Sequence, residues 1–179
     1  MGFSLLPTQV ILGAFLLTWL SACVVFDLRS RQVPTLLTVI PLILAAIWRL
    51  FQGDWQLVLL TVVLTLLSDL PQANWRIPLG CCAAIAGLSI AGSPDMVYAM
   101  LVIFAVWAMW EIGATGGADA KIIIALMLLF ADGLLFIPIV LVGGVQGLAA
   151  LIAKRKTIPY TVAITLGTAA WLWLGVVGY

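Results

Sequence analysis

Residues 5–26 read LLPTQVILGAFLLTWLSACVVF, a continuous run without one charged side chain. A helix that crosses a bilayer needs about 20 apolar residues, so this run has the right length. It is too long for the core of a signal peptide, and it lacks a basic amino-terminal region and a small-residue cleavage site. We therefore expect it to be a membrane helix.

The rest of the chain repeats this pattern. Apolar stretches cover roughly residues 34–51, 55–70, 77–92, 95–112, 119–131, 133–152 and 158–178. Of the 179 residues, 65% are hydrophobic and 8% are charged, whereas about a quarter of the residues in a soluble domain are charged. The chain lacks enough polar residues for a hydrated shell, so its apolar stretches must face lipid or one another. Because a helix satisfies its own backbone hydrogen bonds in lipid, the sequence predicts an all-α fold. We expect a polytopic transmembrane helical bundle of about eight membrane segments, forming a single domain over residues 1–179.

Basic residues set the expected orientation of these segments. With eight crossings and the first ending in the cytoplasm, seven of the eight basic residues fall on the cytoplasmic side: Arg29, Arg31, Arg76, Lys121, Lys154, Arg155 and Lys156. Arg49 falls on the other side. This asymmetry agrees with the positive-inside rule and predicts a multi-pass protein of the cell membrane. A net charge of +1 provides no surface for nucleic acid.

The residue types that are absent limit the chemistry. The sequence has no histidine, which excludes Ser-His and Cys-His catalysis and histidine ligation of zinc or haem. Cys23, Cys81 and Cys82 form no C-x-x-C pair, so neither a zinc site nor a disulfide framework is indicated. We expect no metal and no cofactor. Carboxylates are among the few groups left for catalysis.

Seven acidic residues are present, and two of them have an unusual position. Asp54, Asp95 and Asp132 fall in outer turns and Asp69 near an inner loop, where a solvated or capping role is expected. Asp27 closes the first apolar run, and Asp119 opens another directly after a glycine-rich turn. Both acids lie at about the same depth on the cytoplasmic side, and an ionisable group in such a place is a functional candidate.

Structural roles for the same acids stay open at this point. Asp27 can pair with Arg29 or Arg31, and Asp119 can cap its own helix. Glu111, near the end of a span, is either a member of a buried network or a loop charge.

Three segments carry a resemblance to a known family: residues 27–38, 116–121 and 158–160, which read DLRSRQVPTLLT, GGADAK and IPY. They resemble motifs of the type IV prepilin peptidases, which are intramembrane aspartic proteases of the GxGD type. Residues 27–38, DLRSRQVPTLLT, resemble the first aspartate motif, with Thr35 at the usual asparagine. Residues 116–121, GGADAK, resemble the second, G-x-G-D-x-K, with Ala118 at its second glycine. Residues 158–160, IPY, resemble the closing Ile-Pro-Phe segment. The motifs span nearly the whole chain. Four crossings separate the two aspartates, where the family usually has two, and an even number still returns both to one face.

The resemblance implies a function and a set of site residues. It implies an endopeptidase of the prokaryotic plasma membrane, facing the cytoplasm, that removes the short basic leader of pilin-like precursors. The partners would be these precursors and the lipid bilayer. The catalytic residues would be Asp27 and Asp119. The supporting residues would be Gly116, Gly117, Ala118, Lys121, Pro34, Pro159 and Tyr160. The cysteine-containing cytoplasmic insertion of many bacterial members is lacking, so no methyl transfer is expected.

Two nearby carboxylates have the chemistry that this reaction needs. Like charges at short range cannot both ionise, so such a pair retains one proton over a wide pH range. The ionised acid takes a proton from water, and the protonated acid polarises the peptide carbonyl. Because the pair titrates as one system, the two roles are not assigned to particular residues. Gly116 and Gly117 let the backbone approach an extended substrate, and Ala118 keeps that surface small. Lys121 either influences the nearby carboxylate or anchors to lipid headgroups.

Other functions fit parts of the same pattern. A small ion- or proton-coupled transporter would use the same acids, with Glu111 as a third partner at mid-membrane. A presenilin-like protease shares the G-x-x-D logic, but it would need a Pro-Ala-Leu segment where this chain has residues 158–160. A purely structural membrane subunit is a further alternative.

Overall fold

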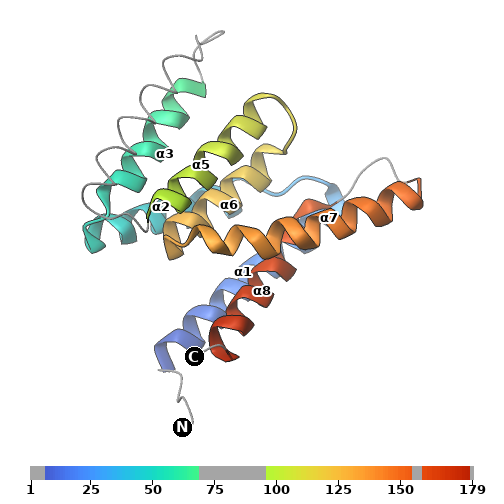
Figure 1. Ribbon diagram of the computed structural model, residues 1–179, viewed down its shortest axis with the longest axis horizontal. Coiled ribbons are helices and arrows are strands. Elements are labelled where there is room, and N and C mark those ends of the chain that lie inside the picture. Colours follow the sequence, from blue (N-terminus) through green and yellow to red (C-terminus); the bar gives the residue numbers. More distant parts are fainter. Residues whose placement is uncertain (1–6, 69–95, 155–158, 178–179) are drawn as a thin grey trace. The chain divides into compact units, whose positions relative to one another are not determined.

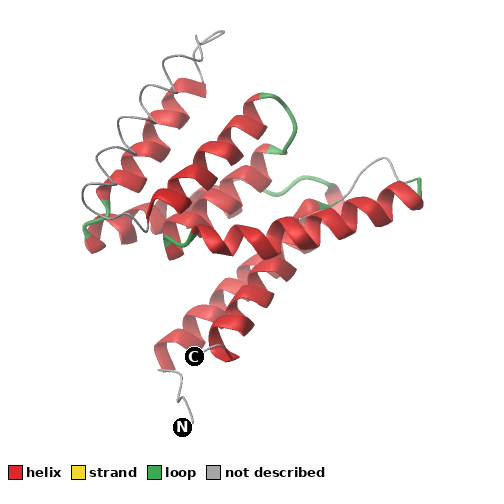
Figure 2. Ribbon diagram, in the orientation of Figure 1, coloured by secondary structure: helices red, strands yellow, loops and turns green. Residues whose placement is uncertain are grey.

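The computed structural model describes residues 7–68, 96–154 and 159–177, and throughout these ranges every regular element is helical (Figure 2). The helices are α1 (Pro7–Ser30), α2 (Thr35–Gln52), α3 (Trp55–Ser68), α5 (Met96–Glu111), α6 (Gly117–Phe130), α7 (Phe136–Ile152) and α8 (Tyr160–Val177), with a 3-10 turn at Gly133–Leu135. The predicted all-α class is confirmed. The apolar stretch predicted at 77–92 lies outside the described residues.

The helices form two compact units (Figure 1). Unit 1 consists of Met1–Pro34 and Leu135–Tyr179, and so contains α1, α7 and α8. Unit 2 consists of Thr35–Leu134 and contains α2, α3, α5 and α6. Each unit is described by itself below.

In unit 1, α8 packs against both α1 and α7 (Figure 1). The approach of α7 to α8 is close because glycines stand at the contact. A Cβ on Gly167 would lie 2.5 Å from Cα of Ile139, a distance that atoms do not tolerate. Small residues are the usual means by which helices approach in an apolar solvent, where contact area and not water exclusion holds them together.

Unit 2 is built around α6. Every residue of this helix from Ile122 to Leu128 is buried. The helix packs against α2 on one side and α5 on another, and α3 packs against α5 and α2. A helix that is apolar all round, as α6 is after Lys121, is typical of a position inside a bundle.

Two helices of unit 2 end in the same type of glycine cap. The amide of Gly53 donates to the carbonyl of Leu50 and that of Asp54 to the carbonyl of Arg49. At the end of α5, the amide of Gly113 likewise donates to the carbonyl of Trp110 and that of Ala114 to the carbonyl of Met109. Both glycines have positive φ, 86° and 73°, as this cap requires at the residue that ends the helical turn. Glycine therefore stops α2 and α5 where the sequence predicted turns.

Three of the described helices are long and apolar enough to cross a bilayer: Ile11–Ser30, Thr35–Gln52 and Gly133–Ile152. Shorter apolar helices cover Trp55–Ser68, Met96–Glu111 and Tyr160–Leu174. Large apolar side chains are exposed along the long helices, for example Ile40, Ile43 and Leu44 on α2. Exposed apolar surface of this extent is typical of proteins that contact lipid.

Candidate functional site

Asp27 lies in the last turn of α1 and accepts a hydrogen bond from α8. The hydroxyl of Thr161 donates to Oδ2 of Asp27 over 2.6 Å. The helix continues beyond the aspartate to Ser30, and the amide of Arg31, at φ 54°, donates back to the Asp27 carbonyl. The sequence predicted that Asp27 closes the first apolar run at the end of a helix, and it lies in the last turn, three residues before Ser30. It still stands at the end of an apolar run.

The first turn of α8 is fixed against α7. The side-chain amide of Gln146 donates to the carbonyl of Pro159 over 3.0 Å. The ring of Tyr160 lies so close to Gly143 that a Cβ there would be 2.8 Å from Cε2. Pro159 directly precedes the helix, where its missing amide costs nothing. These contacts hold the closing motif in place next to Thr161, which is 2% exposed.

Asp119 lies in the first turn of α6, beside the two glycines of its motif. Gly116 is the N-cap, with extended backbone at φ −70° and ψ 144°. A Cβ on Gly116 would be 3.1 Å from Oδ2 of Asp119, and a Cβ on Gly117 would be 3.1 Å from Nε1 of Trp110. The glycines thus leave room for the carboxylate and for an indole from α5. An acid in a first turn also interacts favourably with the helix dipole.

The other predicted residues have simpler positions. Pro34 is exposed and directly precedes α2, as the first motif predicts. Ala118 and Lys121 are half-buried on the first turns of α6. Glu111 is the exposed last residue of α5.

The predicted site residues therefore form two groups. Unit 1 brings Asp27 to the first turn of α8, next to Pro159 and Tyr160. Unit 2 brings Asp119 together with Gly116 and Gly117.

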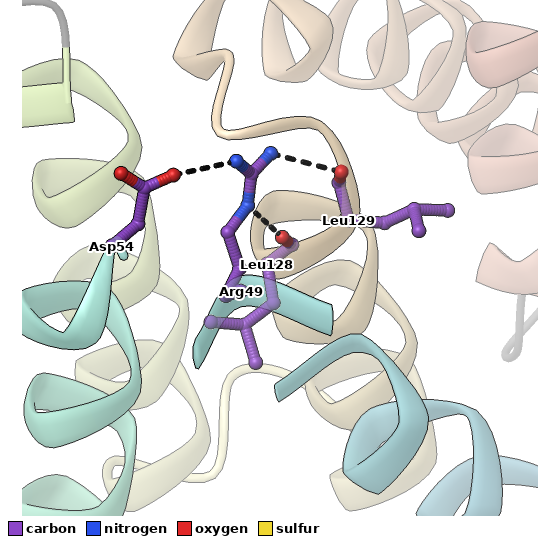
Figure 3. Close-up of polar contacts among 4 residues, drawn as sticks. All are labelled: Arg49, Asp54, Leu128 and Leu129. Carbon is purple, nitrogen blue, oxygen red and sulfur yellow. Dashed lines mark hydrogen bonds and ion pairs between the residues drawn. The ribbon is translucent and has the colours of Figure 1, made fainter. Parts of the chain in front are cut away.

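A third polar cluster lies in unit 2, at the carboxyl end of α6, whereas Asp119 lies in the first turn of that helix. Figure 3 shows the four residues of the cluster. Arg49, in the last turn of α2, donates from Nε to the carbonyl of Leu128 and from Nη2 to that of Leu129 over 2.9 Å. Its Nη1 forms an ion pair of 2.7 Å with Oδ2 of Asp54, directly before α3. The two side chains are only 11% and 18% exposed. We call these four residues the Arg49 cluster.

Sequence reasoning missed three of these roles. Asp54 was assigned a solvated or capping role in a turn, and it is the partner of Arg49. Thr161 directly follows the motif at 158–160, and a hydroxyl in the first turn of an apolar helix is the signal that would have found it. Trp110, on α5, lies against Gly117, and no local sequence pattern indicates this contact.

Comparison with known proteins adds no relative. No family model, no curated protein and no solved structure matches this chain. The function is therefore argued from the residues themselves.

Proposed function

We propose that this chain is an intramembrane aspartic endopeptidase that removes the short basic leader of prepilin-like precursors at the cytoplasmic face of a prokaryotic plasma membrane. Asp27 and Asp119 are the catalytic residues of the proposal. It includes a bundle of about eight crossings, with both acids at one membrane face.

One observation carries the proposal: each motif aspartate stands at the end of an apolar helix, with small or hydroxyl-bearing neighbours around its carboxylate. Asp27 has the Thr161 hydroxyl at 2.6 Å. Asp119 has Gly116, whose missing side chain leaves the space that the carboxylate occupies. The motif order along the chain adds to this support.

The proposed reaction is hydrolysis of one peptide bond. The ionised acid accepts a proton from water while the oxygen of that water attacks the carbonyl carbon. The protonated acid gives its proton to the carbonyl oxygen, which produces a tetrahedral diol. When the C–N bond breaks, the leaving nitrogen takes a proton from the acid that is now protonated, and one diol hydroxyl gives its proton to the other acid, so the products are a carboxylic acid and an amine. The pair ends with one proton, as it began.

The direct test is cleavage by purified protein in liposomes. The substrate is a precursor with a short basic leader, a glycine before the cut and one apolar helix. We expect wild type to release the leader, and Asp27→Asn and Asp119→Asn each to lower the rate at least about 1,000-fold while inserting normally. Robust cleavage by either variant rejects the proposal. Proton-coupled flux without cleavage would favour the transporter.

Convergence of the two acids has a separate test. Asp27→Cys and Asp119→Cys are combined in a background with Cys23, Cys81 and Cys82 replaced by serine. A short bifunctional thiol reagent should then link residues 27 and 119, which proteolysis and mass spectrometry detect. Gly13→Cys with Asp119→Cys is the control pair, and it should stay unlinked. Failure of the first pair to link in the membrane would exclude a shared-proton dyad.

A further inference from the structure

We propose that Thr161 is a positioning residue, which holds Oδ2 of Asp27 so that the other carboxylate oxygen, Oδ1, is the one that exchanges a proton in the reaction. This inference rests on the proposed function, because it assigns the orientation of an acid in that reaction. Its basis is the contact between α1 and α8 within unit 1.

The contact has the geometry of a hydroxyl bound to a carboxylate. Its length, 2.6 Å, lies in the range of about 2.5–3.0 Å that O–H···O hydrogen bonds adopt. Thr161 is 2% exposed, so water has little access to the hydroxyl. A buried hydroxyl without an acceptor is costly, and Asp27 supplies one.

Six other hydroxyls of the described helices donate within their own helix. Those of Thr18, Ser30, Thr61, Thr65, Ser68 and Thr165 each donate to the carbonyl four residues earlier. This back-bonding is the ordinary behaviour of serine and threonine in helices. Thr161 is the second residue of α8, so the residue four places earlier precedes the helix. Its hydroxyl is directed to a side chain 134 residues away in sequence.

The donor itself is held firmly. A β-branched side chain has few rotamers in a helix. The first turn of α8 is fixed to α7 by the bond from Gln146 to the Pro159 carbonyl, and the Tyr160 ring lies against Gly143. A fixed donor restricts rotation of the Asp27 carboxylate about its last bond. Catalytic groups need this, because they must be held within about 10–20° of the productive geometry.

The test compares three variants in the cleavage assay. Thr161→Val keeps the shape and removes the hydroxyl, Thr161→Ser keeps the hydroxyl, and Thr165→Val removes a hydroxyl one turn later that bonds only within α8. We expect Thr161→Val to lower kcat about 10- to 100-fold with KM unchanged, since misplacing a reacting group costs about that much. Thr161→Ser should retain most of the rate, and Thr165→Val all of it.

A readout without proteolysis keeps the inference testable by itself. A carboxyl-directed reagent labels Asp27, and mass spectrometry measures the rate of labelling. We expect Thr161→Val to raise that rate severalfold relative to wild type, while Thr161→Ser and Thr165→Val leave it unchanged.

The outcomes separate the two proposals. Normal cleavage and labelling in Thr161→Val, with Asp27→Asn inactive, would overturn the role of Thr161 and leave the protease in place. Equal loss in the valine and serine variants would also overturn it, because the hydroxyl would not be the cause. Absence of cleavage by wild type would reject the protease, and with it the reaction in which Thr161 is assigned a role.

Discussion

The Arg49 cluster and the Asp27–Thr161 contact both place a charged group at the end of an apolar helix, but they surround it differently. Arg49 has an ionic partner and two helix-terminal carbonyls, and the three contacts together join α2, α3 and α6. A cation at the carboxyl end of a helix also interacts favourably with its dipole. Asp27 is held by a neutral hydroxyl at 2.6 Å. A charge matched by ionic and carbonyl partners is suited to a structural role, whereas a carboxylate held through one oxygen keeps the other for chemistry.

The largest expected effect is a difference in cleavage activity between variants of Asp27 and of Asp54. Asp27→Asn should lower cleavage at least about 1,000-fold with little change in stability, since the amide keeps the shape and cannot accept the proton. Asp54→Asn should lower stability and leave the cleavage rate per folded molecule unchanged. Leader release and unfolding in mild detergent measure the two properties. Loss of activity in both variants without loss of folding would contradict the assignment of a structural role to Asp54 and a catalytic role to Asp27.

The next effect concerns the cation of the Arg49 cluster. Arg49→Met should lower the free energy of unfolding by about 3 kcal/mol, because it leaves Asp54 and two carbonyls without their partner in a site of low exposure. Arg49→Lys should lose less, since one ammonium can replace only part of a forked donor. Denaturant titration of purified protein measures both, and an unchanged midpoint for Arg49→Met would show that the cluster does not stabilise unit 2.

A smaller effect is expected where α8 packs on α7. Gly167→Ala should destabilise the protein by about 1–3 kcal/mol, because the new methyl group would meet the backbone of Ile139 at 2.5 Å. Gly147→Ala, on α7, is the matched control. A methyl group at Gly147 would have no atom within 4 Å, so replacement there should be neutral or stabilising by up to about 1 kcal/mol. Similar melting temperatures for the two variants would contradict the close packing.

The smallest effect tests the space beside the second aspartate. Gly116→Ala places a methyl group 3.1 Å from Oδ2 of Asp119, so the carboxylate has to shift by a few tenths of an ångström. We expect a three- to tenfold lower kcat with unchanged stability. Gly13→Ala, whose methyl group would face open space on α1, should leave kcat unchanged. A normal rate for Gly116→Ala would show that the glycine is not needed for the acid.

Much of the fold follows from local pattern. The predicted stretches and the observed helices agree to within a few residues wherever the structure describes the chain, because apolar runs end at glycine, proline and aspartate turns. The boundaries moved for local reasons. Helix α1 extends past Asp27 because polar residues need not end a helix, and the left-handed Arg31 stops it. Helix α6 begins before Asp119 because Gly116 supplies the extended N-cap.

The local pattern of apolar runs and turns does not predict contacts between residues that are far apart in the sequence. The sequence singled out Asp27 and Asp119 by their place at the ends of apolar runs, but the bond to Thr161 joins residues 134 apart. The asymmetry of basic residues set Arg49 apart without indicating its partners. The carbonyls of Leu128 and Leu129 belong to the backbone, so no side chain near them signals that a cation binds there.

The order of residues in the Asp27–Thr161 contact has a consequence for biogenesis. The ribosome synthesises α1 first, and more than a hundred further residues are added before Thr161, the hydroxyl partner of Asp27, is made. During that interval a carboxylate ends a nascent apolar helix without the bond that orients it. Unit 1 is complete only once α8 has been inserted beside α1, so synthesis of the last helix sets the earliest moment at which the Asp27 side chain reaches its final geometry.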